Sequence, residues 1–120
     1  MPRGTLDVFA IEGKDLKNIE FFGKIDPSLV VRVDSANKQQ TEAKKDTVNP
    51  AWQQRFQFDL YEGNNELFVE CYDKSKLIGE TVVDLNQIFQ TGEVEQEYPI
   101  QTKKGEDAGS IRLGLKFTPQ

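Results

Sequence analysis

Few residue types that perform acid–base, nucleophilic or metal chemistry are present in this 120-residue chain. Histidine is absent, which excludes His-based general acid–base catalysis, Ser-His and Cys-His nucleophilic pairs, and His-ligated zinc. The single cysteine, Cys71, cannot form an intrachain disulfide, and its place in the apolar run 67–72 predicts a small core side chain. Paired carboxylates and lysine chemistry survive on composition, but no spacing indicates either, so we expect a protein that is not an enzyme.

The overall charge narrows the classes of partner. The formal net charge is −5, and no run of Lys or Arg exceeds two residues. Nucleic-acid binders usually carry a basic face, so no nucleic-acid partner is expected. The acidic balance also argues against purely electrostatic adhesion to anionic lipid, although it is compatible with a local basic patch.

The sequence also predicts where the protein resides. Apolar runs such as 29–31 are far too short to span a bilayer, and strand-like sequence begins too early for a signal peptide. We therefore expect a cytoplasmic protein. We expect one domain over 1–120, monomeric in isolation, and the Met1 start suggests the N-terminal domain of a longer protein.

Short apolar or alternating runs separated by Gly, Pro, Asn and Asp make up the chain. The clearest alternation is at the end, where Ile111, Leu113, Leu115 and Phe117 are predicted to face inward. One helical turn is expected over 84–89, with Asp84 as its N-cap. The pattern predicts an all-β, eight-stranded antiparallel β-sandwich, with strands over 5–11, 28–34, 39–45, 52–60, 66–72, 77–83, 95–100 and 110–117.

Several motifs, in the correct order, resemble those of the C2 domain family. Residues 23–31 are similar to the family's Gly-x-Ser-Asp-Pro-Tyr signature, with Ile25 in place of Ser and Ser28 in place of Tyr. Thr47–Trp52 matches the T-x-N-P-x-W/F turn, and further matches lie at 13–16, 56–58, 70–73 and 77–80. The resemblance implies the C2 fold. Because a strand closes the chain and nothing precedes the first one, it implies the type II permutation.

The same resemblance implies candidate calcium ligands. Asp26 occupies the family's Asp-Pro position, Glu20 stands where Asp is usual, and Asp73 matches the first acidic position of the third loop. That loop is short, and Lys74 and Lys76 stand where further carboxylates belong, so they would repel a cation. We therefore expect no required cofactor, and Ca²⁺ binding that is absent or weak.

Three other readings of these acidic residues remain open. Asp46 in the second loop could add a fourth ligand to a weak site. Asp26 could instead accept backbone N–H bonds at a loop–strand junction. Lys74 or Lys76 could replace the metal by pairing with Asp26 or Asp73.

The first loop contains apolar residues beside lysines. In C2 domains that dock on bilayers, aromatic loop tips enter the interface, and the resemblance extends that role to Phe21, Phe22 and Ile25. The neighbouring Lys24, Lys74 and Lys76 would then meet anionic headgroups or a protein partner. The alternative is that one phenylalanine packs inward.

A second lipid site in the family is a lysine patch on the strands around the second loop. The corresponding residues here are Lys38, Lys44 and Lys45, diluted by Glu42 and Asp46. This pattern is compatible with a patch that binds lipid headgroups. It is equally compatible with a solvated edge strand whose charges prevent pairing with another strand. Glu93, Glu95 and Glu97 share one strand face by spacing, which we interpret as solvated.

Two binding functions follow. One is a Ca²⁺-independent module for protein partners, slightly favoured by the short third loop and the negative charge. The other is a peripheral module for anionic phospholipid membranes, with the alternative that it depends on Ca²⁺ through Glu20, Asp26 and Asp73.

Overall fold

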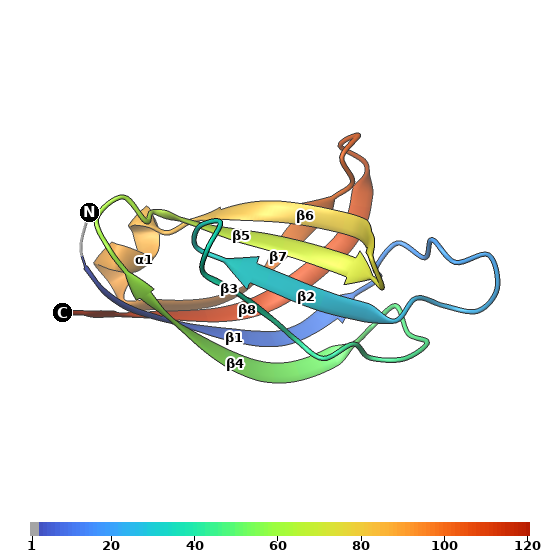
Figure 1. Ribbon diagram of the computed structural model, residues 1–120, viewed down its shortest axis with the longest axis horizontal. Helices are drawn as coiled ribbons and strands as arrows, with labels where there is room; N and C mark the ends of the chain where they lie inside the picture. The colour runs from blue at the N-terminus through green and yellow to red at the C-terminus, as the bar shows by residue number, and fades with distance from the viewer. Residues whose placement is uncertain (1–2) are drawn as a thin grey trace.

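The computed structural model describes residues 3–120 and confirms the all-β prediction (Figure 1). The molecule is elongated, 48 × 27 × 25 Å, and its strands run along the long axis. The elements are β1 Gly4–Lys14, β2 Pro27–Arg32, β3 Lys38–Gln40, β4 Ala51–Leu60, β5 Glu66–Asp73, β6 Lys76–Asp84, α1 Asn86–Thr91, β7 Glu93–Gln101 and β8 Asp107–Pro119.

The strands are ordered β3-β2-β5-β6-β7-β8-β1-β4, and neighbours are antiparallel. Strands β6 and β7 share one register pair, Glu80 with Gln101, whereas the other neighbouring strands pair over three or more positions. The chain therefore forms two sheets, β3-β2-β5-β6 and β7-β8-β1-β4, that meet along one side. Strand β8, the last in the chain, lies between β7 and β1, inside its sheet rather than at an edge.

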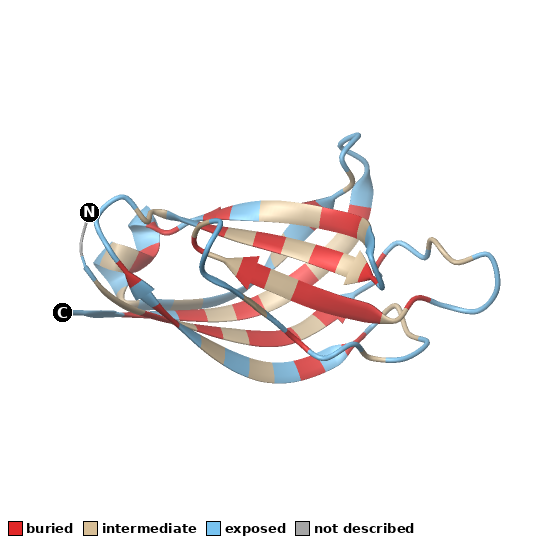
Figure 2. Ribbon diagram, in the orientation of Figure 1, coloured by how far each residue is buried: buried red, intermediate tan, exposed pale blue. Residues whose placement is uncertain are grey.

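The core lies between these two sheets. Ile111, Leu113, Leu115 and Phe117 are buried, which confirms the inward face predicted for β8. The alternation is visible as bands of buried and exposed residues along the strands (Figure 2). Because successive strand residues point to opposite faces, one face of each sheet supplies the core and the other contacts solvent.

The third predicted strand, 39–45, is wrong in extent because β3 ends at Gln40. The cause is Thr41, which is buried and bonds to β2 with both its backbone and its side chain. Its N–H donates to the Leu29 carbonyl at 2.9 Å, and its Oγ1 accepts the Leu29 N–H at 2.9 Å. A hydroxyl thus takes the place of the next backbone acceptor, and the regular ladder stops there.

The predicted helical turn is displaced along the chain. The helix spans Asn86–Thr91 with Leu85 at the N-cap and no side-chain cap bond, so the prediction of Asp84 as N-cap is wrong. Asp84 Oδ1 instead accepts the Asn86 N–H at 2.9 Å, an Asx turn that precedes the helix. Gly92 ends the helix with φ 91°, and β7 begins directly after it.

Cys71 is fully buried in β5, as its apolar surroundings predict. Burial, with a smaller contribution from the charge of Asp73, raises the pKa of its thiol to about 12. The thiol is therefore inert to reagents that attack thiolates near neutral pH.

Three connections lie at one end of the long axis, and α1, the start of β1 and the end of β8 lie at the other end (Figure 1). The three are 15–26 between β1 and β2, 41–50 between β3 and β4, and 74–75 between β5 and β6. No helix among residues 3–120 is long and apolar enough to cross a membrane.

Candidate functional site

The loop 15–26 is fixed at its base by the neighbouring connection 41–50. Gly13 donates its N–H to the Pro50 carbonyl at 2.8 Å, and Leu16 donates to Val48 at 3.0 Å. Nearer the tip, Asn18 Nδ2 donates to the Gly23 carbonyl at 2.9 Å, closing the segment between them into a compact turn. These hydrogen bonds therefore hold the loop in place, with residues 19–22 at its tip.

Phe21 and Phe22 are exposed at the tip of this loop. Their relative exposures are 90% and 84%, and their rings contact each other edge to face with centroids 4.8 Å apart. The alternative that one of the two rings packs inward is therefore wrong. The Asn18–Gly23 bond closes the turn so that both rings lie outside it.

Ile25, predicted as a third apolar contact residue, lies elsewhere. It is fully buried and belongs to the core, so it cannot contact a partner or a bilayer. Ile19 is half-buried and also packs against the core. The exposed apolar surface of the loop is thus confined to the Phe21–Phe22 pair.

The β2–β5 register brings the predicted carboxylates together. It places Pro27 opposite Asp73, so that Asp26 comes directly before the paired position. Asp73 is 1% exposed, and its Oδ1 accepts the Asp26 N–H at 3.0 Å. Its Oδ2 is buried and has no N–H partner among the described residues.

Glu20 contacts the same carboxyl group. A hydrogen bond with Asp73, together with the negative charge of Asp73, raises the pKa of Glu20. Burial acts to raise the pKa of Asp73, but the bonds from Glu20 and the Asp26 N–H, with Lys74 and Lys76, hold it below its usual value. These opposed shifts mean that Asp73 keeps its negative charge to lower pH than Glu20 does.

The other two acidic side chains fasten loops. Asp26 Oδ1 accepts the Asp46 N–H at 2.8 Å, which is the backbone-accepting role considered for Asp26. Asp46 Oδ1 accepts the Lys24 N–H at 2.8 Å, so the two carboxylates tie connection 15–26 to connection 41–50. Within residues 3–120, no group of three or more His, Cys, Asp or Glu side chains is arranged to hold a metal ion. In this arrangement the donor set falls short of the six to eight oxygens typical of Ca²⁺.

The lysines of this end point outward. Lys24, Lys74 and Lys76 are exposed, and Lys74 Nζ lies 3.9 Å from Glu20 Oε2. A lysine does pair with a candidate ligand, but the partner is Glu20 rather than the predicted Asp26 or Asp73. The separation and exposure make this a weak ion pair.

The predicted patch of Lys38, Lys44 and Lys45 is divided between two places. Lys38 lines a shallow groove of about 530 Å³ on the outer face of β3, β2 and β5, and Lys44 and Lys45 do not line it. Lys44 lies in connection 41–50, where its N–H donates to the Pro27 carbonyl at 3.1 Å. The full lining of the groove is Val30, Arg32, Ser35, Lys38, Gln40, Glu70, Tyr72, Lys74 and Ser75.

Arg32 is a cation of this groove that the sequence motifs did not predict. It lies directly opposite Lys38 in the β2–β3 register. Its Nε is 3.5 Å from Glu70 Oε1, and its guanidinium lies 4.4 Å from the centroid of the Phe68 ring. The signal was its alternation with the inward Val31 and Val33, which places Arg32 on the outer face.

Comparison with known proteins assigns the family. The model of the C2 domain matches residues 4–100, so the chain belongs to the C2 domain family. "Elicitor-responsive protein 3" from Oryza sativa subsp. japonica is 27% identical over 125 residues, covering 100% of this chain and 87% of that protein.

Solved structures agree with this assignment. A "C2 domain-containing protein from putative elicitor-responsive gene" is 27% identical and superposes with a TM-score of 0.86, covering 99% of this chain and 91% of that one. A calcium-bound structure of two C2 domains of Extended-Synaptotagmin 2 superposes with a TM-score of 0.87 at 22% identity, covering 99% of this chain and 47% of that one. The latter likeness concerns the fold.

Proposed function

We propose that this C2 domain is a non-catalytic module that docks on anionic phospholipid membranes through the tip of loop 15–26. The observation that carries the proposal is the pair Phe21 and Phe22, almost fully exposed in loop 15–26, which lies at one extremity of the molecule (Figure 1). Leaving two large rings in water is unfavourable, and burying each one fully gains about 1.5–3 kcal/mol. A bilayer interface offers that burial without a specific pocket.

The charges around the tip support an anionic surface. At this end the lysine side chains are exposed or half-buried, while Asp26, Asp46 and Asp73 accept backbone N–H bonds. Each lysine near an anionic leaflet contributes about 1 kcal/mol, which is enough to select headgroups but not to replace the aromatic contribution. The lysines of these connections are Lys17, Lys24, Lys44, Lys45 and Lys74, with Lys76 at the start of β6.

We further propose that docking needs no tightly bound Ca²⁺. Lys74 lies beside Glu20, and one oxygen each of Asp26 and Asp46 is already occupied by a backbone donor. In a Ca²⁺-dependent domain the bound ion supplies positive charge at the membrane-facing end, whereas here the lysines supply it. Attachment to the membrane is peripheral. The unbound protein resides in the cytoplasm.

A Ca²⁺-dependent version is the second candidate, favoured by Asp73 Oδ2, which is buried and has no hydrogen-bond partner within residues 3–120. Glu20, Asp26 and Asp73 would hold the ion, which would add positive charge at the membrane-facing end. All three side chains would hold the ion as carboxylates, because carboxyl groups coordinate Ca²⁺ in their charged form.

Vesicle co-sedimentation tests the proposal. The protein is mixed with vesicles of phosphatidylcholine alone or with added phosphatidylserine, in Ca²⁺ or in chelator. We expect pelleting on the anionic vesicles that is equal in both conditions. Pelleting only in Ca²⁺ would establish the second candidate, and no pelleting in any condition would contradict membrane docking in favour of a protein partner.

A further inference from the structure

Strand β7 has an outer edge that no other strand occupies over most of its length. It pairs with β8 from Glu93 to Gln101, but with β6 at Gln101 alone within the described residues. The opposite side of the sandwich is bridged, since Gln39 Nε2 donates to the Gln57 carbonyl of β4 at 2.9 Å. Residues 93–98 therefore present backbone N–H and C=O groups that an added strand can use.

A glycine permits the one contact at which β6 and β7 pair. A Cβ at Gly79 would lie 2.7 Å from the Ala108 Cβ and 3.1 Å from Ile100 Cδ1, so only glycine permits this close approach. From there toward α1 the two strands have no further register pair among the described residues. The sandwich is open on that side.

A groove of about 330 Å³ lies in the opening between β6, α1 and β7, and its polar lining is Asp84, Gln87, Thr91, Glu93 and Gln96. Val82, Val83, Ile88, Val94 and Tyr98 supply its apolar lining. Val82 is 50% exposed, one of the few large apolar side chains outside the loop tip that are so open to solvent. The groove therefore lies directly beside the unpaired edge of β7.

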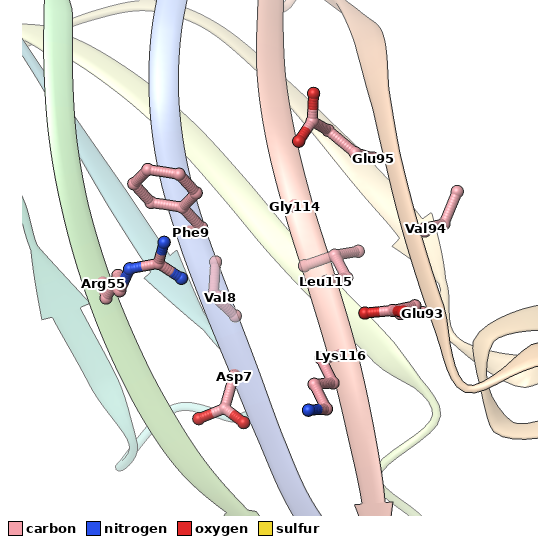
Figure 3. A pocket seen from close by; sticks show the side chains of 10 residues that line it. All are labelled: Asp7, Val8, Phe9, Arg55, Glu93, Val94, Glu95, Gly114, Leu115 and Lys116. Atoms are coloured by element: carbon pink, nitrogen blue, oxygen red, sulfur yellow. The ribbon is translucent and has the colours of Figure 1, made fainter.

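Side chains of β7 alternate between this groove and the outer face of the sheet. Val94, Gln96 and Tyr98 line the groove, together with Glu93 at the start of the strand. In Figure 3, Glu93 and Glu95 point toward β8, whereas Val94 points away from it. Glu97 shares the face of Glu93 and Glu95 by strand periodicity.

The charge on the outer face of β7 is only partly balanced. Glu95 accepts bonds from Arg112 at 2.9 and 3.0 Å. Glu93 and Glu97 are exposed and have no ion pair within residues 3–120. The β7 edge therefore has backbone groups without a strand partner, glutamates on its outer face and apolar side chains on the face toward the groove.

We infer that the β7 edge is a docking site for an extended peptide segment in which Lys or Arg alternates with apolar residues. Added as a strand beside β7, such a segment places its cations opposite the glutamates and its apolar side chains in the groove. Directly opposed residues on adjacent strands have Cβ atoms about 4.5–5.5 Å apart, which allows these pairs to interact. The groove adjoins α1, at the end opposite loop 15–26, so this site is independent of membrane docking (Figure 1).

A rival interpretation is that the glutamates and Pro99 only guard the edge against pairing. A guarded edge needs no exposed apolar groove beside it, and it predicts that no alternating peptide binds in preference to a scrambled one.

The test uses a fluorescent peptide of alternating Lys and Val, Lys-Val-Lys-Val-Lys-Val-Lys, and a peptide of the same composition with its lysines clustered. We expect the alternating peptide to bind roughly tenfold more tightly by anisotropy. The amide NMR shift changes that the peptide causes in the protein should fall on residues 81–84 and 93–98. Equal affinity for both peptides, no binding by either, or shift changes elsewhere would overturn the inference.

Charge variants sharpen this test. Glu93→Gln with Glu97→Gln should weaken binding of the alternating peptide several-fold, whereas Glu62→Gln with Glu106→Gln removes the same charge at other exposed positions and should not. Equal weakening by both pairs would reduce the effect to net charge and contradict an edge site. Phe21→Ala with Phe22→Ala should leave peptide binding unchanged, which separates this inference from the proposed membrane function.

Discussion

Replacing Phe21 and Phe22 together by alanine should lower the partition coefficient onto phosphatidylserine-containing vesicles by at least about 100-fold. Two rings that each gain about 1.5 kcal/mol or more on burial account for about 3 kcal/mol of binding. Both rings lie outside the core, so the melting temperature should not change. Co-sedimentation over a series of lipid concentrations measures the partition coefficient.

Tyr61→Ala is the matched control for this experiment. Tyr61 is also an exposed aromatic residue, at 54%, but it lies in the connection between β4 and β5, away from the loop end. Its removal should leave vesicle binding unchanged. If the Phe21/Phe22 double variant binds as well as wild type, or if Tyr61→Ala is equally impaired, insertion of the loop tip is wrong.

Leu113→Ala should destabilise the fold by about 2–5 kcal/mol. Leu113 is fully buried in β8, and the register places it between Ala10 of β1 and Gln96 of β7. The loss combines reduced burial of apolar surface with a cavity between the sheets. Urea unfolding followed by far-ultraviolet circular dichroism measures the change in free energy of unfolding.

Thr118→Ala provides the control for the core substitution. Thr118 is exposed near the end of the same strand, so its replacement should change the free energy of unfolding by less than about 0.5 kcal/mol. If Leu113→Ala lowers the free energy of unfolding by less than about 1 kcal/mol, the packing of Leu113 in the core between the sheets is contradicted.

The inward face of β8 could be predicted from the sequence because period-two alternation directly reflects burial. Motif order was equally informative, since it identified the family before any coordinates. Strand β3 was harder to predict. Its early end depends on the hydroxyl of Thr41 bonding to Leu29, which is a tertiary contact rather than a local preference.

In the candidate site, too, motifs predicted some features, whereas tertiary contacts decided others. Asp26 and Asp73 were recognised by motif, and the β2–β5 register does bring them together. The sequence could not show that Ile25 is buried while Phe21 and Phe22 are exposed, because the Asn18–Gly23 bond decides which residues form the tip. Nor could it show that Arg32 lies opposite Lys38, since cross-strand neighbours depend on register.

A spin label at the loop tip tests the membrane account most directly. Phe22→Cys can be labelled selectively with a nitroxide, because Cys71 is buried and its thiol pKa is about 12. With the protein on phosphatidylserine-containing vesicles, we expect power saturation to place this label below the lipid phosphates. A label at Glu97→Cys should remain in water. A bound protein whose label at position 22 is as accessible to an aqueous relaxation agent as the label at position 97 would contradict docking through the loop tip.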